Sequence, residues 1–162
     1  MSKLDSFIRR MSAQRDCLNL VAEKLDMVDG PVLELGLGNG RTYDHLRELF
    51  GEDDVYVFDR QKNAHPDYSP DDEHMILGDF LETLPTSVLR LPGSAKLAHC
   101  DIGTGDKAQS VALAELIAPM VDSLLQTGGY VVSDQPFPYP GWELQALPEG
   151  VAEGRYHIYR KA

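Results

Sequence analysis

The chain has 162 residues, of which 43% are hydrophobic and 25% charged, which is typical of a globular protein with one core. Its formal net charge of −11 disfavours a nucleic-acid partner and favours a small-molecule one. No apolar run is long enough to cross a membrane, no secretory signal is visible, and two cysteines are too few for a disulfide framework, so we expect a cytoplasmic protein.

The N-terminal part of the chain predicts one long helix, over residues 4–27, which Asp29-Gly30-Pro31 ends. Apolar side chains recur there at steps of three and four residues, as on the buried face of a helix. These side chains are Leu4, Phe7, Ile8, Met11, Leu18, Val21 and Leu25.

Strands and helices are then expected to alternate. Short apolar runs predict strands at 32–35, 55–58, 74–77, 95–100 and 130–133. Helices are predicted over 41–50, over 80–89 with an interruption at Pro85, and over 108–125, with Gly128-Gly129 ending the last. The apolar stripe of that last helix is Val111, Leu113, Leu116, Ile117, Met120 and Leu124.

The C-terminal residues differ in composition from the rest. Residues 136–141 form a stiff, proline-rich aromatic loop, and residues 142–147 and 155–160 are expected to pair as antiparallel strands. The fold class is therefore α/β, with a Rossmann-like doubly wound sheet that is mostly parallel. We expect one domain, with an N-terminal helix (1–30), a cofactor-binding core (31–135) and a short antiparallel C-terminal edge (136–162).

A glycine-rich turn follows the first strand. Glycines stand at 36, 38 and 40, and Glu34 precedes them in the strand. A dinucleotide site would have its third glycine at position 41, which is arginine here. The spacing thus favours S-adenosylmethionine, whose carboxylate can lie at the following helix start and whose ammonium needs an acceptor that Glu34 could supply or organise.

Four predicted strands end in an acidic residue. These residues are Asp59, Asp79, Asp101 and Asp134. Each alone could be a turn-forming aspartate. Because the carboxyl ends of parallel strands meet at one edge of the sheet, we expect them to lie together beside the glycine turn.

In the order of these motifs, the chain resembles a class I S-adenosylmethionine-dependent methyltransferase, over about residues 4–134. The resemblance implies that Asp59 binds both ribose hydroxyls, that Arg60 flanks the adenine, that Asp79 accepts from the adenine amino group and that Phe80 packs on the ring. It also implies that Asp101 lies near the methyl group. The expected cofactor-binding residues are Glu34, Gly36, Gly38, Asn39, Gly40, Arg41, Thr42, Asp59, Arg60, Asp79, Phe80 and Asp101.

The chain departs from the family pattern after the fifth strand. Only 28 residues follow Asp134, and the usual substrate-specificity insertions are absent. The short tail suggests that a neighbouring subunit closes the site, so a homo-oligomer is expected.

The expected reaction moves a methyl group to an oxygen or nitrogen of a small-molecule acceptor. His99 and Asp101 are the candidate bases, since residues two apart on a strand face the same side. His99 is also consistent with a core histidine whose hydrogen bonds are satisfied. A weaker hypothesis is a Mg²⁺ site at Asp101, Asp134 and Gln135, similar to that of catechol O-methyltransferases.

Two other functions stay open at this point: a non-catalytic cofactor-binding module and an NAD-dependent oxidoreductase. The aromatic side chains Phe137, Tyr139 and Trp142 could line an acceptor pocket or cap the edge of the sheet. Arg9, Arg10 and Gln14 of the first helix could cover the cofactor.

Overall fold

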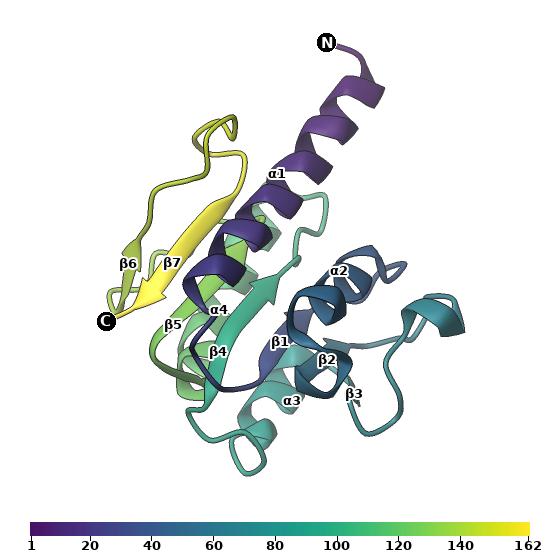
Figure 1. Ribbon diagram of the computed structural model, residues 1–162, viewed down its shortest axis with the longest axis vertical. Coiled ribbons are helices and arrows are strands. Elements are labelled where there is room, and N and C mark those ends of the chain that lie inside the picture. Colours follow the sequence, from purple (N-terminus) through teal and green to yellow (C-terminus); the bar gives the residue numbers. More distant parts are fainter.

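A computed structural model describes all residues, 1–162, and shows one seven-stranded sheet in the order β3-β2-β1-β4-β5-β7-β6 (Figure 1). The strands are β1 (Val32–Leu35), β2 (Val55–Asp59), β3 (Met75–Leu77), β4 (Ala95–Cys100), β5 (Leu125–Ser133), β6 (Trp142–Leu144) and β7 (His157–Lys161). The helices are α1 (Lys3–Lys24), α2 (Arg41–Phe50), α3 (Phe80–Ser87) and α4 (Lys107–Leu124), with short 3₁₀ turns at Glu52–Asp54 and Pro66–Tyr68.

The sheet confirms the predicted mixture of parallel and antiparallel pairing. The first five strands run parallel, with β1 and β4 adjacent at the centre. β7 pairs antiparallel with both β5 and β6, which makes the C-terminal edge. Because the chain direction across the sheet changes between β1 and β4, this is the switch point where α/β folds bind ligands.

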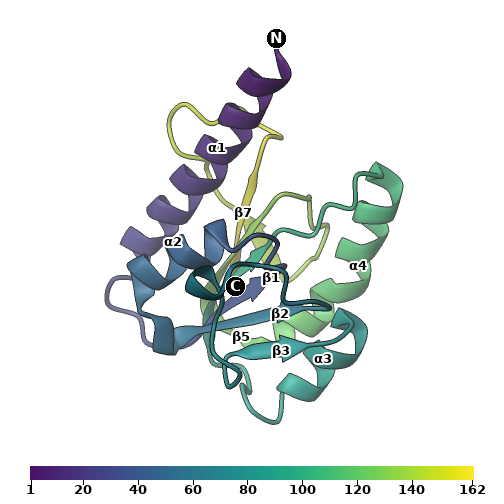
Figure 2. The same ribbon diagram turned by 90° about the vertical axis from the view of Figure 1, so that its right-hand side faces the viewer.

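Helices cover both faces of the sheet (Figure 2). α1 and α2 pack on one face, around a core cluster that includes Leu18, Leu46 and Val57. α3 and α4 pack on the other, around a cluster that includes Leu84, Ile117 and Phe58. None of the helices combines the length and the apolar content that a bilayer crossing requires.

The N-terminal part of α1 does not bury the apolar face that its periodicity predicts. Leu4, Phe7 and Ile8 are exposed, and burial begins only at Ala13. Both views show the start of α1 projecting beyond the end of the sheet (Figures 1 and 2). The periodicity predicts the helix correctly. It cannot predict which part of the helix is buried, because that depends on how far the sheet extends beneath it.

Two predicted helix boundaries are wrong. Pro85 does not interrupt α3, where the Ser87 hydroxyl donates to the Thr83 carbonyl (2.7 Å) and reinforces the turn that spans the proline. Gly128-Gly129 does not end α4, because the chain enters β5 at Leu125 and the glycines lie within that strand, beside a register irregularity against β4.

The buried stripe of α4 also differs from the predicted one. Ala114, Ile117, Val121 and Leu124 are buried, whereas Leu116 is exposed. α4 thus packs on α3 and the sheet through a face rotated from the one that its largest side chains indicate.

The aromatic residues of the tail cap the edge of the sheet rather than line a pocket. Phe137 and Trp142 are buried, with ring centroids 5.3 Å apart, and the Tyr139 and Trp142 centroids lie 5.0 Å apart. The Tyr159 hydroxyl accepts a hydrogen bond from the Phe137 amide (2.9 Å). This packing joins Phe137, Trp142 and Tyr159 to the core cluster on the α3 and α4 side of the sheet.

We expect neither cysteine to react with a thiol reagent in the native protein. Cys17 and Cys100 are free and fully buried. Burial raises the pKa of Cys17 to about 12 and raises the pKa of Cys100 well above its usual value, so both stay protonated and unreactive. Titration with Ellman's reagent should detect two thiols in denaturant and none rapidly without it; one fast thiol in the native protein would contradict this.

Candidate functional site

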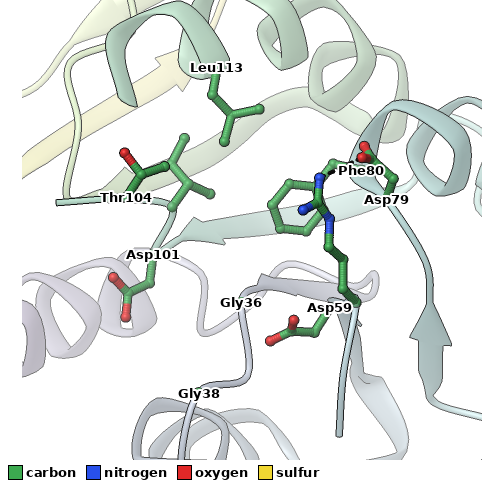
Figure 3. Close-up of a pocket in the computed structure, with 11 residues that line it drawn as sticks. Gly36, Gly38, Asp59, Asp79, Phe80, Asp101, Thr104 and Leu113 are labelled. Atoms are coloured by element: carbon green, nitrogen blue, oxygen red, sulfur yellow. Dashed lines mark hydrogen bonds and ion pairs between the residues drawn. The ribbon is translucent and has the colours of Figure 1, made fainter. Parts of the chain in front are cut away.

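A cavity of about 430 Å³ lies at the carboxyl ends of β1, β2 and β4, at the switch point of the sheet. Its volume is within the range of small-ligand pockets, roughly 300–1,000 Å³. Figure 3 shows Asp101 on one side of it and Asp59, Asp79 and Phe80 opposite, with the Gly36–Gly38 backbone between them. The lining residues are Gly36, Gly38, Asp59, Arg60, Asp79, Phe80, Asp101, Ile102, Gly103, Thr104 and Leu113.

Asp59 and the glycine turn are held together directly. One oxygen of Asp59, Oδ2, accepts a hydrogen bond from the Leu37 amide (2.8 Å), and the Gly36 amide donates to the Phe58 carbonyl (2.8 Å). The other carboxylate oxygen faces the amide of Gln61 at 3.3 Å. The predicted juxtaposition of the strand-2 acid with the glycine turn is therefore confirmed.

Gly36 and Gly38 serve different purposes. Both have positive φ angles, +97° and +52°, which glycine adopts without strain. A Cβ at position 36 would lie 2.5 Å from the Asp101 carbonyl oxygen, so this glycine lets the ends of β1 and β4 approach closely. A Cβ at position 38 would meet no atom within 4 Å, so this backbone is open to a ligand in the cavity.

We expect Gly36→Ala to destabilise the fold by about 1–3 kcal/mol more than Gly38→Ala, because only the first adds a backbone clash to the strain of a positive φ. Urea unfolding of the two variants measures the difference. Gly105→Ala is the control for strain alone, since its φ is +87° and its surroundings are open. Equal losses in all three variants would show that the approach of β1 to β4 is not tight.

On the side of the site where adenine is expected, Arg60 and Asp79 form an ion pair at the start of α3. Arg60 donates to Asp79 Oδ2 (2.6 Å), and Asp79 Oδ1 accepts from the Leu81 amide (2.9 Å) as the N-cap of α3. The Leu81 amide and the Arg60 guanidinium together lower the pKa of Asp79. Phe80, half-buried, follows Asp79 and lines the same cavity.

The segment after β4 is fixed by Asp134. Both oxygens of its carboxylate accept backbone hydrogen bonds, from Ile102 (3.1 Å) and Gly103 (2.9 Å). Burial raises the pKa of Asp134, and the nearby negative charge of Asp101 raises it further. Asp134 thus supports the wall that carries Asp101.

A second cavity of about 610 Å³ opens on the other side of this wall. It shares Asp101 and Gly103 with the first cavity. Its other lining residues come from α1, the loop after β4, the end of β5 and the connection between β6 and β7: Arg10, Gly105, Asp134, Gln135, Ala152, Glu153, Gly154, Arg155 and Tyr156.

A buried chain of polar side chains extends from Tyr156, which lines the second cavity, into the core. His99 Nδ1 is hydrogen bonded to Glu34 Oε1 (2.5 Å) and its Nε2 to the Tyr156 hydroxyl (2.6 Å), which in turn accepts from Gln14 Nε2 (3.1 Å). Glu34 and His99 have no exposed surface. Burial alone would lower the pKa of His99, but the adjacent Glu34 carboxylate outweighs burial, so the pKa is raised.

The structure therefore separates two residues that the strand pattern places together. Asp101 is exposed at the cavities, whereas His99 is buried and both of its ring nitrogens are engaged. The alternation rule fails because β4 ends at Cys100, and Asp101 already belongs to the following loop. Glu34 is likewise buried and lines neither cavity.

Other expected cofactor residues also lie outside the cavity lining: Asn39, Gly40, Arg41 and Thr42. Of the first-helix residues, Arg10 lines the second cavity, while Gln14 is buried against Tyr156 and Arg9 is on the outer surface. Sequence reasoning missed Gly103, Thr104 and Arg155. The run Gly103-Thr104-Gly105 directly after a strand-end acid was a usable signal for the first two.

The residues of the Mg²⁺ hypothesis, Asp101, Asp134 and Gln135, do line one cavity. No group of three acidic, histidine or cysteine side chains is gathered there or elsewhere in the chain to hold a metal ion. Both Asp134 oxygens are already used by backbone amides. Two carboxylates and one side-chain amide do not make such a group, and a Mg²⁺ site at these three residues stays a prediction.

Comparison with known proteins agrees with this geometry. A family model described as S-adenosyl-L-methionine methyltransferase matches residues 1–161. The crystal structure of an S-adenosyl-L-methionine methyl transferase from Silicibacter pomeroyi DSS-3 is similar over 100% of this chain and 99% of that one, with 42% identity and a TM-score of 0.93.

A more distant likeness concerns the fold alone. The aminoglycoside resistance methyltransferase NpmB1 shares 14% identity over 91% of this chain and 93% of that one, with a TM-score of 0.54. A comparison with curated proteins found no significant match.

The family match favours S-adenosylmethionine over a nicotinamide cofactor, as the glycine spacing does, and it favours an enzyme over a binding module. Membership of this family accounts for the glycine turn, the acids at the strand ends and the order of the strands in the sheet. The chain belongs to the S-adenosyl-L-methionine methyltransferase family.

Proposed function

We propose that this methyltransferase transfers its methyl group to a nitrogen or oxygen of a small-molecule acceptor bound in the second cavity. The observation that carries the proposal is that the two cavities meet at Asp101 and Gly103. One cavity would hold the cofactor and the other the acceptor, with the transfer at their junction. The net charge of −11 supports an acceptor other than a nucleic acid.

In this proposal the first cavity holds S-adenosylmethionine. Asp59 accepts hydrogen bonds from the ribose hydroxyls, as a carboxylate can do for two donors at once. Phe80 packs against the adenine, and the Arg60–Asp79 pair borders it. The open space at Gly38 admits the rest of the cofactor close to the backbone. Because Glu34 is fully buried and lines neither cavity, it does not contact the ammonium group in this proposal.

The cofactor supplies an activated methyl group on a sulfonium, so the protein mainly has to align the two reactants and exclude water. The Asp134 carboxylate fixes the backbone of residues 102 and 103, and this holds Asp101 at the junction. Asp101 is exposed to the acceptor side and can take the proton that a nitrogen or oxygen nucleophile loses.

A labelling experiment tests the proposal. The protein is incubated with methyl-labelled S-adenosylmethionine and a cell extract divided by ultrafiltration into small molecules and macromolecules. We expect label in the small-molecule fraction. Label confined to the macromolecular fraction, or none in either, would overturn the proposal.

The same assay tests Asp101. Because general-base catalysis contributes about 10²–10⁴-fold, Asp101→Asn should lower kcat by about that factor. Cofactor affinity, measured by calorimetry, should change little. Glu115→Gln, on the exposed face of α4, is the control. Equal kcat in the Asp101 variant and the control would remove Asp101 from the mechanism.

A further inference from the structure

Two arginines border the second cavity from opposite ends of the sequence. Arg10 lies in α1, and Arg155 lies in the connection between β6 and β7. Both ribbon views show this connection beside the N-terminal half of α1 (Figures 1 and 2). Side chains of the two segments also line a shared outer groove, including Ser12 from α1 and Val151 from the connection.

Neither guanidinium has an acidic partner. The chain has eight ion pairs, and neither Arg10 nor Arg155 takes part in any of them. The guanidinium of Arg10 instead lies over the Phe7 ring, with its Cζ atom 5.8 Å from the ring centroid. In a chain with 26 acidic and 15 basic residues, two unpaired arginines on one cavity are available for an anionic group.

The opposite wall of the cavity has the other sign of charge. Asp101 stands at the junction with the cofactor cavity, and Asp134 lies behind it with both oxygens bound to the backbone. Glu153, the remaining acid, is exposed at the connection that carries Arg155. The cavity is thus negatively charged beside the expected methyl position, where Asp101 and Asp134 lie. It is positively charged at the α1 side, where Arg10 and Arg155 lie.

We propose, on the basis of the proposed function above, that the acceptor carries an anionic group, a carboxylate or a phosphate, which Arg10 and Arg155 bind. Its nucleophilic nitrogen or oxygen then points away from the arginines toward Asp101. Planar guanidinium groups suit both anions because each can donate two parallel hydrogen bonds. The arginines select and orient the acceptor, and Asp101 faces the reacting atom.

The test uses the full chain saturated with S-adenosylhomocysteine and titrated separately with inorganic phosphate and with benzoate. Backbone amide NMR signals of residues 152–156 and the Nε–H signals of the arginines report binding. We expect at least one anion to shift these signals. A response to phosphate alone assigns a phosphate group to the acceptor, and a response to benzoate alone assigns a carboxylate.

The variants Arg10→Met and Arg155→Met should each weaken that binding by about 10-fold, the worth of one charge-assisted hydrogen bond. Arg9→Met removes the same charge one residue away from Arg10, on a side chain that does not line the cavity, and should leave the affinity unchanged. The inference is overturned if neither anion shifts these signals at tens of millimolar. It also falls if Arg9→Met weakens binding as much as Arg10→Met, or if the two cavity variants bind as the wild type does.

The inference and the proposed function fail separately. A protein that methylates a small molecule in the labelling assay but binds neither anion overturns the inference alone. A protein that places label only on macromolecules, or on nothing, overturns the proposed function whatever the titration shows.

Discussion

Replacing Asp59 with alanine is expected to weaken S-adenosylmethionine binding by about 100-fold. The proposed hydrogen bonds from the ribose hydroxyls to this carboxylate are worth about 1.5–3 kcal/mol each, since the acceptor is charged. The alanine also removes the acceptor for the Leu37 amide, which orders the glycine turn. Isothermal titration calorimetry with the cofactor measures the loss directly.

Two further variants make this test specific. Asp59→Asn keeps an oxygen for the Leu37 amide but loses the charge, so we expect a loss of about 10-fold. Asp54→Ala removes an exposed acid in the 3₁₀ turn directly before the same strand, and this variant should bind as the wild type does. If Asp59→Ala bound the cofactor normally while folding normally, the cofactor site would have to lie elsewhere.

Removing one partner of the Glu34–His99 pair is expected to destabilise the fold by about 3–5 kcal/mol, because the other is then left uncompensated in the core. Both side chains are fully buried between β1 and β4, which adjoin at Glu34 and His99. Glu34→Leu and His99→Leu, compared with the wild type in urea unfolding, measure this cost.

The double variant separates pairing from packing. If the cost of each single variant arises from an unpaired partner, Glu34→Leu/His99→Leu should be destabilised by less than the sum of the two. Glu48→Gln, on the exposed side of α2, should change stability by less than about 0.5 kcal/mol. Additive losses in the double variant would show that the two side chains do not interact.

The same pair predicts a pH dependence. The pKa of His99 in the folded protein is raised above its ordinary value of 6.5. The stabilisation by the protonated ring is therefore complete below pH 6.5 and is lost as the pH rises through the folded-state pKa. Urea midpoints should fall across that window in the wild type and stay level in His99→Leu. A fall of equal size in both would assign the dependence to other groups.

Much of the fold could be predicted from local sequence. β1, α2 and β4 have the predicted bounds, because short apolar runs flanked by glycine or acidic turns encode strands and helix starts locally. The errors lie where tertiary contacts decide. Pro85 stays inside α3, and α4 passes directly into β5.

The first cavity was largely predictable as well. Parallel strands place their carboxyl ends at one edge, so Asp59, Asp79 and Asp101 had to meet near Gly36 once the strands were known. The burial of His99 was not predictable, because its partners Glu34 and Tyr156 come from segments 65 and 57 residues away in sequence.

By itself, the sequence determined the α/β class, the glycine turn and the acids of the first cavity. These features depend on spacing along one chain segment and on the rule that parallel strands end together. Only the tertiary structure decided the second cavity. Arg10 and Arg155 are 145 residues apart, and they border one space because α1 and the C-terminal connection pack side by side, which no local pattern specifies.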